Sequence, residues 1–254
     1  MYDWNKYKFV FKPPSPPKIL MLVLASDNNP IYKEHQRIWR SYMHTNPNID
    51  CYFYKGDPTL EQEYKLIEDT LYIQIEDTLE NVYEKTLRAF KFFEPNFHKY
   101  KCIFRTNLSS VVIFHRYIEY CKTIPTHSFC SAHIGIENQV PFPAGAGFTI
   151  TPDIASRLVA ERPPLISQDD VSIGYALQSW GIPITSVNRM DFITPELYND
   201  YHLKIPSIFH FRIKQLVRHI QNINTPYEIE LMEKIVSMYY PSSFEKLKKN
   251  DLIL

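Results

Sequence analysis

The sequence has 254 residues, with 28 basic and 28 acidic side chains, so its formal net charge is zero. A chain without excess positive charge lacks the long-range attraction that drives non-specific binding to nucleic acid or to an acidic membrane. Apolar residues make up 44% and charged residues 22%, which is typical of a folded globular protein and excludes general disorder. No apolar run reaches the roughly 18 residues that a membrane-spanning helix needs.

Residues 1–17 end in the run Pro13-Pro14-Ser15-Pro16-Pro17, which favours a stiff, extended lead-in to the folded part. A ligand for a polyproline-binding domain is the alternative interpretation. This segment lacks the apolar core and the small-residue cleavage site of a signal peptide. The four cysteines form no CxxC pair, and the runs around Cys51 and Cys102 are apolar. We therefore expect buried free thiols and a reducing, cytoplasmic location.

Strands and helices alternate along the next segments. Lys18 to Ala25 is apolar throughout, as in a strand that is covered on both faces, and Asp27 to Pro30 supplies turn residues. The further elements predicted in chain order are a helix over 32–43, strands over 49–54 and 70–75, a helix over 78–93, a strand over 101–105, a helix over 110–122, a helix from about 168 to 180, and mostly helix after residue 209. This order predicts a single α/β domain over residues 18–254, with a central, mostly parallel sheet flanked by helices.

Charge is unevenly distributed along the chain. Residues 55–84 carry a net charge of −7, and residues 85–122 carry a net charge of +6. An acidic surface followed by a basic one suits an anionic small ligand, and solvated helix faces are the alternative explanation.

Three short motifs combine small and polar side chains. The strand over 101–105 runs into Thr106-Asn107-Leu108-Ser109, where polar groups either contact a ligand at the carboxyl end of the sheet or cap the next helix. Gly145-Ala146-Gly147-Phe148 holds two of the six glycines, which allow a tight bend or a ligand close to the backbone. Asp169-Asp170-Val171 opens a helix that also contains Gly174, and each carboxylate either caps that helix or faces a pocket.

In this order the three motifs resemble those of GT-A glycosyltransferases of the β1,3-galactosyltransferase and Fringe-like group. That family has a strand followed by T-D-D-D-V, then G-G-G-[FY], then E-D-V-x-x-G. The resemblance spans roughly residues 18–215. It also includes three weaker similarities: Arg37 and Arg40 near the family's Arg-rich helix, Asn81-Val82-Tyr83-Glu84-Lys85-Thr86 for its N-L-x-x-K-T helix, and His210-Phe211-Arg212 for its C-terminal metal-binding histidine.

The resemblance implies an inverting transferase that moves a sugar from a nucleotide-diphosphate donor, expected to be a UDP-sugar, to a hydroxyl of a glycan acceptor. It implies that Asp170 is the general base, that Asp169 binds the acceptor and that His210 is a metal ligand. The donor-binding residues that it implies are Arg40, Lys85, Arg105, Asn107, Ser109, Gly145, Ala146 and Gly147. Donor and acceptor are then the expected partners, with no nucleic acid.

One position departs from the family pattern. The D-x-D carboxylates that hold a divalent cation are replaced by Asn107 and Ser109, whereas Mg²⁺ and Mn²⁺ prefer carboxylate oxygens. Such a cofactor is therefore weakly supported. Activity without a tightly bound cation is the expectation, with the positive charge supplied by Lys85, Arg105, His210 or Arg212. The alternatives are an inactive glycan- or nucleotide-binding module and a structural protein on the same fold. A core histidine is the alternative for His210.

Overall fold

A computed structural model describes residues 16–192, 200–214, 226–243 and 245. Its main feature is an eight-stranded sheet with the strand order β3-β4-β2-β1-β5-β8-β7-β9. The strands are β1 (Ile19–Leu24), β2 (Ile49–Gly56), β3 (Tyr64–Ile67), β4 (Thr70–Ile73), β5 (Cys102–Asn107), β7 (Cys130–Glu137), β8 (Val140–Ile150) and β9 (Ile184–Ser186). Parallel pairing joins β4, β2, β1 and β5, while β8 runs antiparallel to β5 and β7.

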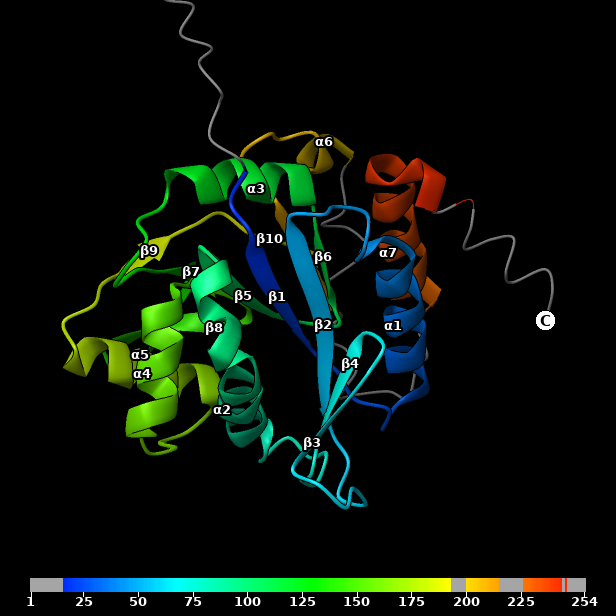
Figure 1. The fold of residues 1–254 in the computed structure, drawn as a ribbon. Helices are drawn as coiled ribbons and strands as arrows, with labels where there is room; N and C mark the ends of the chain where they lie inside the picture. The colour runs from blue at the N-terminus through cyan, green and yellow to red at the C-terminus, as the bar shows by residue number, and fades with distance from the viewer. Residues whose placement is uncertain (1–15, 193–199, 215–225, 244, 246–254) are drawn as a thin grey trace, which may run out of the picture.

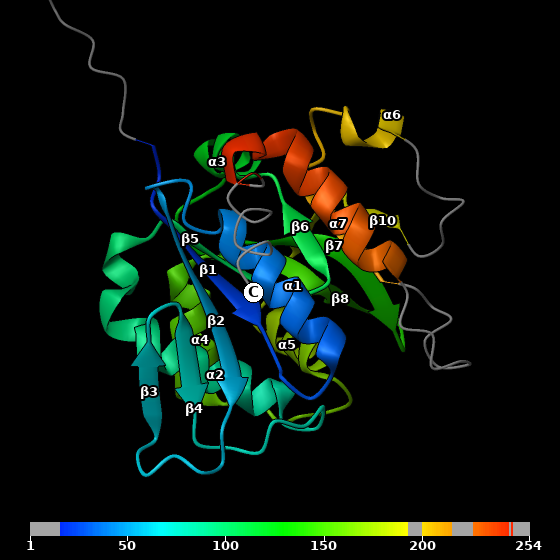
Figure 2. The ribbon, with the colours of Figure 1, turned by 90° about the vertical axis from the view of Figure 1, so that its right-hand side faces the viewer.

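Helices cover both faces of this sheet (Figures 1 and 2). They are α1 (Pro30–Tyr42), α2 (Val82–Phe93), the 3-10 helix η2 (Glu94–Lys99), α3 (Phe114–Thr123), α4 (Pro152–Glu161), α5 (Asp169–Ser179), α6 (Asp200–Leu203) and α7 (Pro226–Tyr239). Helices α1 and α7 lie side by side, joined by an ion pair of 2.6 Å between Arg37 and Glu233. The predicted α/β class, with a central sheet flanked by helices, is confirmed.

Strand β1 shows why its sequence lacks polar residues. Ile19, Met21 and Val23 pack into one hydrophobic cluster with residues of α1, α3 and α7. Leu20 and Leu22 pack into a second cluster, with residues of α2, α4 and α5. All five are fully buried, and burial of each such side chain contributes about 1.5–3 kcal/mol. The predicted burial of this strand on both faces is confirmed.

A second sheet has three strands, in the order β10-β11-β6. They are β10 (Met190–Phe192), β11 (His210–Ile213) and β6 (Ser110–Val112). The helix predicted over 110–122 is therefore wrong at its start, because β6 pairs with β11 and α3 begins only at Phe114. After residue 209 the described residues are mostly helical, as predicted, and β11 is a strand that this prediction did not include. Strands β6 and β11 pair with each other although they lie far apart in the sequence, so the local pattern of neither segment indicates a strand.

The small residues of the second motif lie inside strand β8. Gly147 pairs with Thr106 of β5, so of the two alternatives for Gly145–Gly147 the tight bend does not apply. The glycines instead allow close approach of side chains. A Cβ atom at Gly147 would overlap with the ring of His210, and one at Gly145 would lie 2.9 Å from Oδ2 of Asp170.

All four cysteines are buried and free, as predicted for Cys51 and Cys102. The Sγ atoms of Cys102 and Cys121 lie 3.4 Å apart. The proline-rich lead-in lies outside the described residues except for Pro16 and Pro17, which precede β1. Among the described residues, none of the helices has the length and apolar character that crossing a membrane requires. The single domain and the cytoplasmic location stay predictions.

Candidate functional site

A pocket of about 500 Å³ opens where β1 and β5 end. Its walls come from the end of β1 and the residues after it (Leu24–Ser26), from the start of α2, and from the end of β5 and the residues that follow (Asn107–Ser109). Lys214, which follows β11, closes one side. The carboxyl ends of parallel strands are the usual place for ligands in α/β sheets, and the volume lies in the range of small-molecule sites.

Two oppositely charged side chains meet in this pocket. Nζ of Lys85 lies 2.5 Å from Oδ1 of Asp77, and the Lys85 side chain is only 3% exposed. Lys85 therefore lines the pocket, and its role in donor binding stays a prediction of the resemblance. Sequence reasoning missed Asp77 and Lys214 as pocket residues. The acidic run 55–84 is a weak signal for Asp77, whereas Lys214 reaches the pocket only through the pairing of β11.

Asn107 and Ser109 both line the pocket. The hydroxyl of Ser109 donates to Oδ1 of Asn107 at 3.0 Å. Ser109 does not cap a helix, since α3 begins at Phe114 and Ile113 occupies its N-cap position. Of the two alternatives for this motif, the helix cap is therefore wrong for Ser109, and contact with a ligand stays a prediction.

Asp170 lies in the first turn of α5 and is 8% exposed. Its Oδ2 accepts a hydrogen bond of 2.7 Å from the backbone N–H of Gly145, and its Oδ1 accepts one of 3.0 Å from that of Val171. Burial, together with the neighbouring charge of Asp169, raises the pKa of Asp170 above its ordinary value, and these hydrogen bonds offset part of the rise. A carboxylate with a raised pKa is a stronger base.

Arg105 holds the surroundings of Asp170 together. Its buried guanidinium donates to the hydroxyl of Tyr54 at 3.0 Å, to Oδ2 of Asp169 at 2.5 Å and to the backbone carbonyl of Gly145. Burial disfavours the charge, but Asp169 and Tyr54 outweigh this effect and raise the pKa of Arg105 further. Arg105 and Asp169 therefore bind each other in the described structure, and neither lines the 500 Å³ pocket.

The strand segment Gly145–Gly147 lies between Asp170 and the residues next to the pocket. The carbonyl of Ala146 accepts hydrogen bonds from Thr106 at 2.7 Å and from Ser110 at 3.1 Å. Oγ of Ser110 also lies 3.2 Å from Oδ1 of the pocket residue Asn107. The structure thus brings eight of the expected site residues into one connected group of side chains and strand: Arg105, Asn107, Ser109, Gly145, Ala146, Gly147, Asp169 and Asp170.

His210 is buried behind this group. Its Nε2 lies 3.0 Å from Oγ of Ser110, and its ring meets that of Phe104 edge-on with centroids 5.5 Å apart. Burial and the nearby charges of Arg189 and Arg212 lower the pKa of His210 far below the ordinary range, so the ring is neutral. A core histidine with a satisfied hydrogen bond accounts for these contacts.

The residues at the D-x-D positions do not fit a divalent cation. Asn107 offers an amide oxygen, Ser109 a hydroxyl and His210 an imidazole whose Nε2 is bonded to Ser110, and none of them supplies the carboxylate that Mg²⁺ or Mn²⁺ prefers. Across the described ranges, no three His, Cys, Asp or Glu side chains cluster as a metal site would require.

Arg40 lies apart from the pocket. Its guanidinium pairs with Asp69 at 2.9 Å and donates to Oγ1 of Thr70 at 3.2 Å, beside the start of β4. It also stacks over the ring of Phe53. The structure therefore does not bring Arg40 to the other residues of the expected donor-binding set.

No protein-family model and no curated protein sequence matches this chain. Among solved structures, it is similar to a glycosyltransferase involved in the glycosylation of the major capsid of PBCV-1, at 12% identity and a TM-score of 0.46, over 86% of this chain and all of that one. It is also similar to the glycosyltransferase GlyE of Streptococcus pneumoniae TIGR4, at 8% identity and a TM-score of 0.47, over 92% of this chain and 64% of GlyE. The apo form of GlyE gives 13% identity and a TM-score of 0.48 over the same shares. The function proposed below rests on the chain's own site.

Proposed function

We propose that this chain is an inverting glycosyltransferase that moves a sugar from a nucleotide-diphosphate donor, expected to be a UDP-sugar, to a hydroxyl of a glycan acceptor. The observation that supports it best is a spatial one. Hydrogen bonds connect the pocket residue Asn107 through Ser110 to the strand segment Gly145–Gly147, and this segment in turn bonds Asp170, a buried carboxylate whose pKa is raised.

The nucleotide diphosphate would occupy the 500 Å³ pocket. Lys85 and Lys214 place two positive charges on its walls, and Lys85 pairs with Asp77. Asn107 and Ser109 add polar groups that hydrogen-bond to phosphate or sugar oxygens. Fixed charges of this kind stabilise a leaving diphosphate as its negative charge develops.

The transfer step needs one base and one leaving group. Asp170 takes the proton from the acceptor hydroxyl, and the oxygen forms a bond to the anomeric carbon of the donor sugar. The bond from that carbon to the diphosphate breaks on the opposite face, and the diphosphate leaves with the electron pair. Because the residues at the D-x-D positions do not fit a divalent cation, we propose that the step depends on the lysines of the pocket and continues in EDTA.

Replacement of Asp170 by asparagine tests the assignment. Loss of a general base typically lowers turnover about 10²- to 10⁴-fold, and UDP binding should stay unchanged because Asp170 does not line the pocket. Asp57→Asn is the matched control, since Asp57 also accepts a hydrogen bond from a backbone N–H group and lies outside the pocket lining. Turnover of UDP-sugar should be unaffected in that control. Unchanged turnover in Asp170→Asn would contradict the proposal.

A second candidate is a non-catalytic module that binds a nucleotide or a glycan. The hydrogen bonds of Asp170 favour it, because both carboxylate oxygens accept from backbone N–H groups. These bonds are also what a purely structural carboxylate would form. UDP release from a panel of nucleotide sugars, with Mn²⁺, Mg²⁺ or EDTA, separates the two functions. Release from one sugar supports the transferase, whereas binding without release in the presence of acceptors supports the module.

A further inference from the structure

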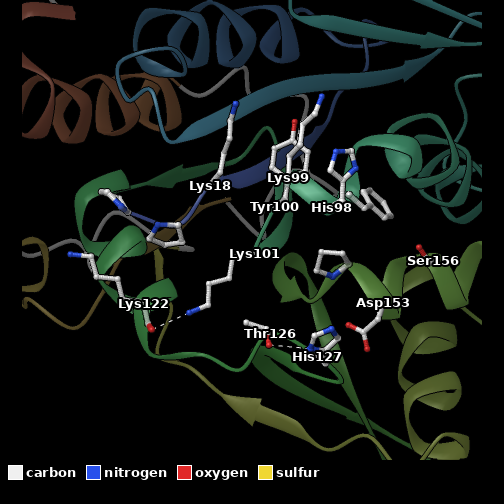
Figure 3. Close-up of a pocket in the computed structure, with 14 residues that line it drawn as sticks. Lys18, His98, Lys99, Tyr100, Lys101, Lys122, Thr126, His127, Asp153 and Ser156 are labelled. Atoms are coloured by element: carbon white, nitrogen blue, oxygen red, sulfur yellow. Dashed lines mark hydrogen bonds between the residues drawn. The ribbon is translucent and has the colours of Figure 1, made fainter. Parts of the chain in front are cut away.

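A second and larger pocket, of about 930 Å³, lies at the other end of the sheet (Figure 3). Lys18 and Lys101, which line it, directly precede β1 and β5, whereas the pocket proposed for the donor lies where these strands end. The walls come from η2, from the end of α3 and from the start of α4. The two pockets are therefore separate sites.

The lining of this second pocket is strongly basic. Four lysines and one aspartate line it, so its formal charge is +3 with the histidines neutral, although the whole chain has no net charge. The lysines are Lys18, Lys99, Lys101 and Lys122. Three of them belong to the basic segment 85–122, so the folded chain concentrates this part of the sequence around one cavity. A cavity with one sign of charge raises the local concentration of ions of the opposite sign.

Two of the four lysines form ion pairs, and the other two, Lys99 and Lys101, bond to neutral oxygens. Lys18 pairs with Asp50 at 3.0 Å, and Lys122 pairs with Glu119 at 2.6 Å. In the described part of the chain, by contrast, Lys99 and Lys101 donate to neutral oxygens: Oδ1 of Asn96 at 2.5 Å and the backbone carbonyl of Lys122 at 3.0 Å.

The lining holds a single carboxylate, and one of its two oxygens is hydrogen-bonded. Oδ2 of Asp153 accepts a hydrogen bond of 2.8 Å from the backbone N–H of Ser128. Figure 3 shows Asp153 across the pocket from Lys18 and Lys99, beside Thr126 and His127. An anion entering the cavity therefore meets the ammonium groups of Lys99 and Lys101, which form no ion pair with a carboxylate of the described residues.

Rings form the apolar part of the walls. Phe97 and Tyr100 come from η2 and the residue after it, and the phenol of Tyr100 is fixed by a hydrogen bond of 2.7 Å to Asp50. Prolines at 16, 17 and 152 complete these surfaces. Fixed rings next to cations suit a ligand that carries both apolar faces and anionic groups.

We propose that this pocket binds an anionic oligosaccharide. Its carboxylate or sulfate groups contact Lys99 and Lys101, and its sugar rings pack against the partly exposed ring of Tyr100. The preference for an anion follows from the lysines, whereas the choice of a saccharide rests on the proposed function. The bound saccharide would be a segment of an acidic acceptor glycan that lies remote from the transfer site. Holding the acceptor at a second point raises its effective concentration near the first.

Calorimetric titration of the full chain with three hexasaccharides tests the proposal. A sulfated and a uronic-acid hexasaccharide should bind, with an affinity that falls as salt rises, whereas neutral maltohexaose should not bind. The double variant Lys99→Gln/Lys101→Gln should weaken binding at least about tenfold. The matched control is Lys65→Gln/Lys91→Gln, which changes the net charge equally at exposed positions away from the pocket. That control should bind like the wild type.

Three results would overturn the proposal: equal weakening in both double variants, equal binding of the neutral sugar, or binding of vesicles with phosphate headgroups in place of the saccharides. UDP release with a small uncharged acceptor is measured in parallel and should be the same in Lys99→Gln/Lys101→Gln as in the wild type. Saccharide binding without UDP release by the wild type would sink the proposed transferase and leave this site standing. UDP release without saccharide binding would do the reverse.

Discussion

The guanidinium of Arg105 and the carboxylate of Asp169 lie 2.5 Å apart and join β5 to the first residue of α5. The two side chains are 2% and 13% exposed, so the pair is largely removed from water. The same guanidinium bonds Tyr54 of β2 and the carbonyl of Gly145 in β8. Arg105 therefore positions the start of α5, and with it Asp170, relative to three strands.

Removal of Arg105 should destabilise the fold. In Arg105→Met the buried charge of Asp169 loses its partner, which costs about 3–5 kcal/mol in the free energy of unfolding. Urea denaturation of the single variants and of Arg105→Met/Asp169→Asn measures the coupling, and the double variant should lose less than the sum of the two. The exposed pair Arg157–Glu161 is the control, because Arg157→Met should cost less than about 1 kcal/mol. Strict additivity in the Arg105 cycle would contradict the coupling.

Turnover should depend on the protonation of Asp170. Burial and the Asp169 charge raise its pKa above the ordinary 3.8, so the acidic limb of the pH profile of kcat should have its midpoint above pH 3.8. Asp169→Asn removes the negative neighbour, which lowers the pKa of Asp170 and moves the limb to lower pH. Glu161→Gln, at a remote exposed carboxylate, should leave the limb in place. An unmoved limb in Asp169→Asn would show that another group controls the profile.

The same shift has a consequence for stability. Because the folded-state pKa of Asp170 lies above that of the unfolded chain, its contribution to stability is complete below the unfolded pKa and is lost as the pH rises through the folded value.

Gly147→Ala should destabilise the fold by about 1–3 kcal/mol, the usual cost of overpacking. The added methyl group would overlap with the ring of His210 and would lie 2.9 Å from Cζ of Phe104. Thermal unfolding measures the loss, and the second substitution His210→Ala should reduce the added cost of the methyl group by making room for it. Gly181→Ala is an informative comparison, because it meets no atoms within 4 Å and has a φ of +68°. Its cost is one of backbone strain, which His210→Ala should leave unchanged.

Lys214→Gln should weaken UDP binding about tenfold, because one charged contact to phosphate is lost from the pocket wall. Titration calorimetry measures the change, and the salt dependence of the affinity should become weaker as well. Lys204→Gln, outside the pocket lining, is the control of equal charge. UDP binding by Lys214→Gln at wild-type strength would remove Lys214 from the proposed donor site.

The strands at the centre of the sheet could be predicted because they are buried and their sequences are accordingly rich in apolar residues. The apolar run of β1 is within one residue of the observed strand at each end. The sequence pattern does not predict strands β3, β7, β8 and β9 or helix α4. Proline and glycine interrupt β8, and the exposed residues of β3 show no apolar alternation, so only their pairing partners specify them.

The candidate site was predictable in part for a similar reason. Asn107 and Ser109 reach the pocket from the end of β5, and Lys85 reaches it from the start of α2, two elements whose order the sequence indicates. Arg40 pairs instead with Asp69, the residue directly before β4, and this partner keeps it away from the pocket. Of the two alternatives for the Gly145–Gly147 run, the bend does not apply, because side chains approach these glycines closely and their φ angles are not positive.

The pairing of β6 with β11 has a consequence for the order of folding. Strand β6 directly follows β5 in the chain, whereas its partner is made much later, and the backbone N–H of Ile213 donates to the carbonyl of Ser109 at 2.7 Å. Contacts between segments so distant in sequence form slowly, because the loop must close before they are gained. On a ribosome, the strands of the large sheet emerge before β11 does. A nascent chain can thus assemble most of its core while the cavity at Asn107 still has an open side.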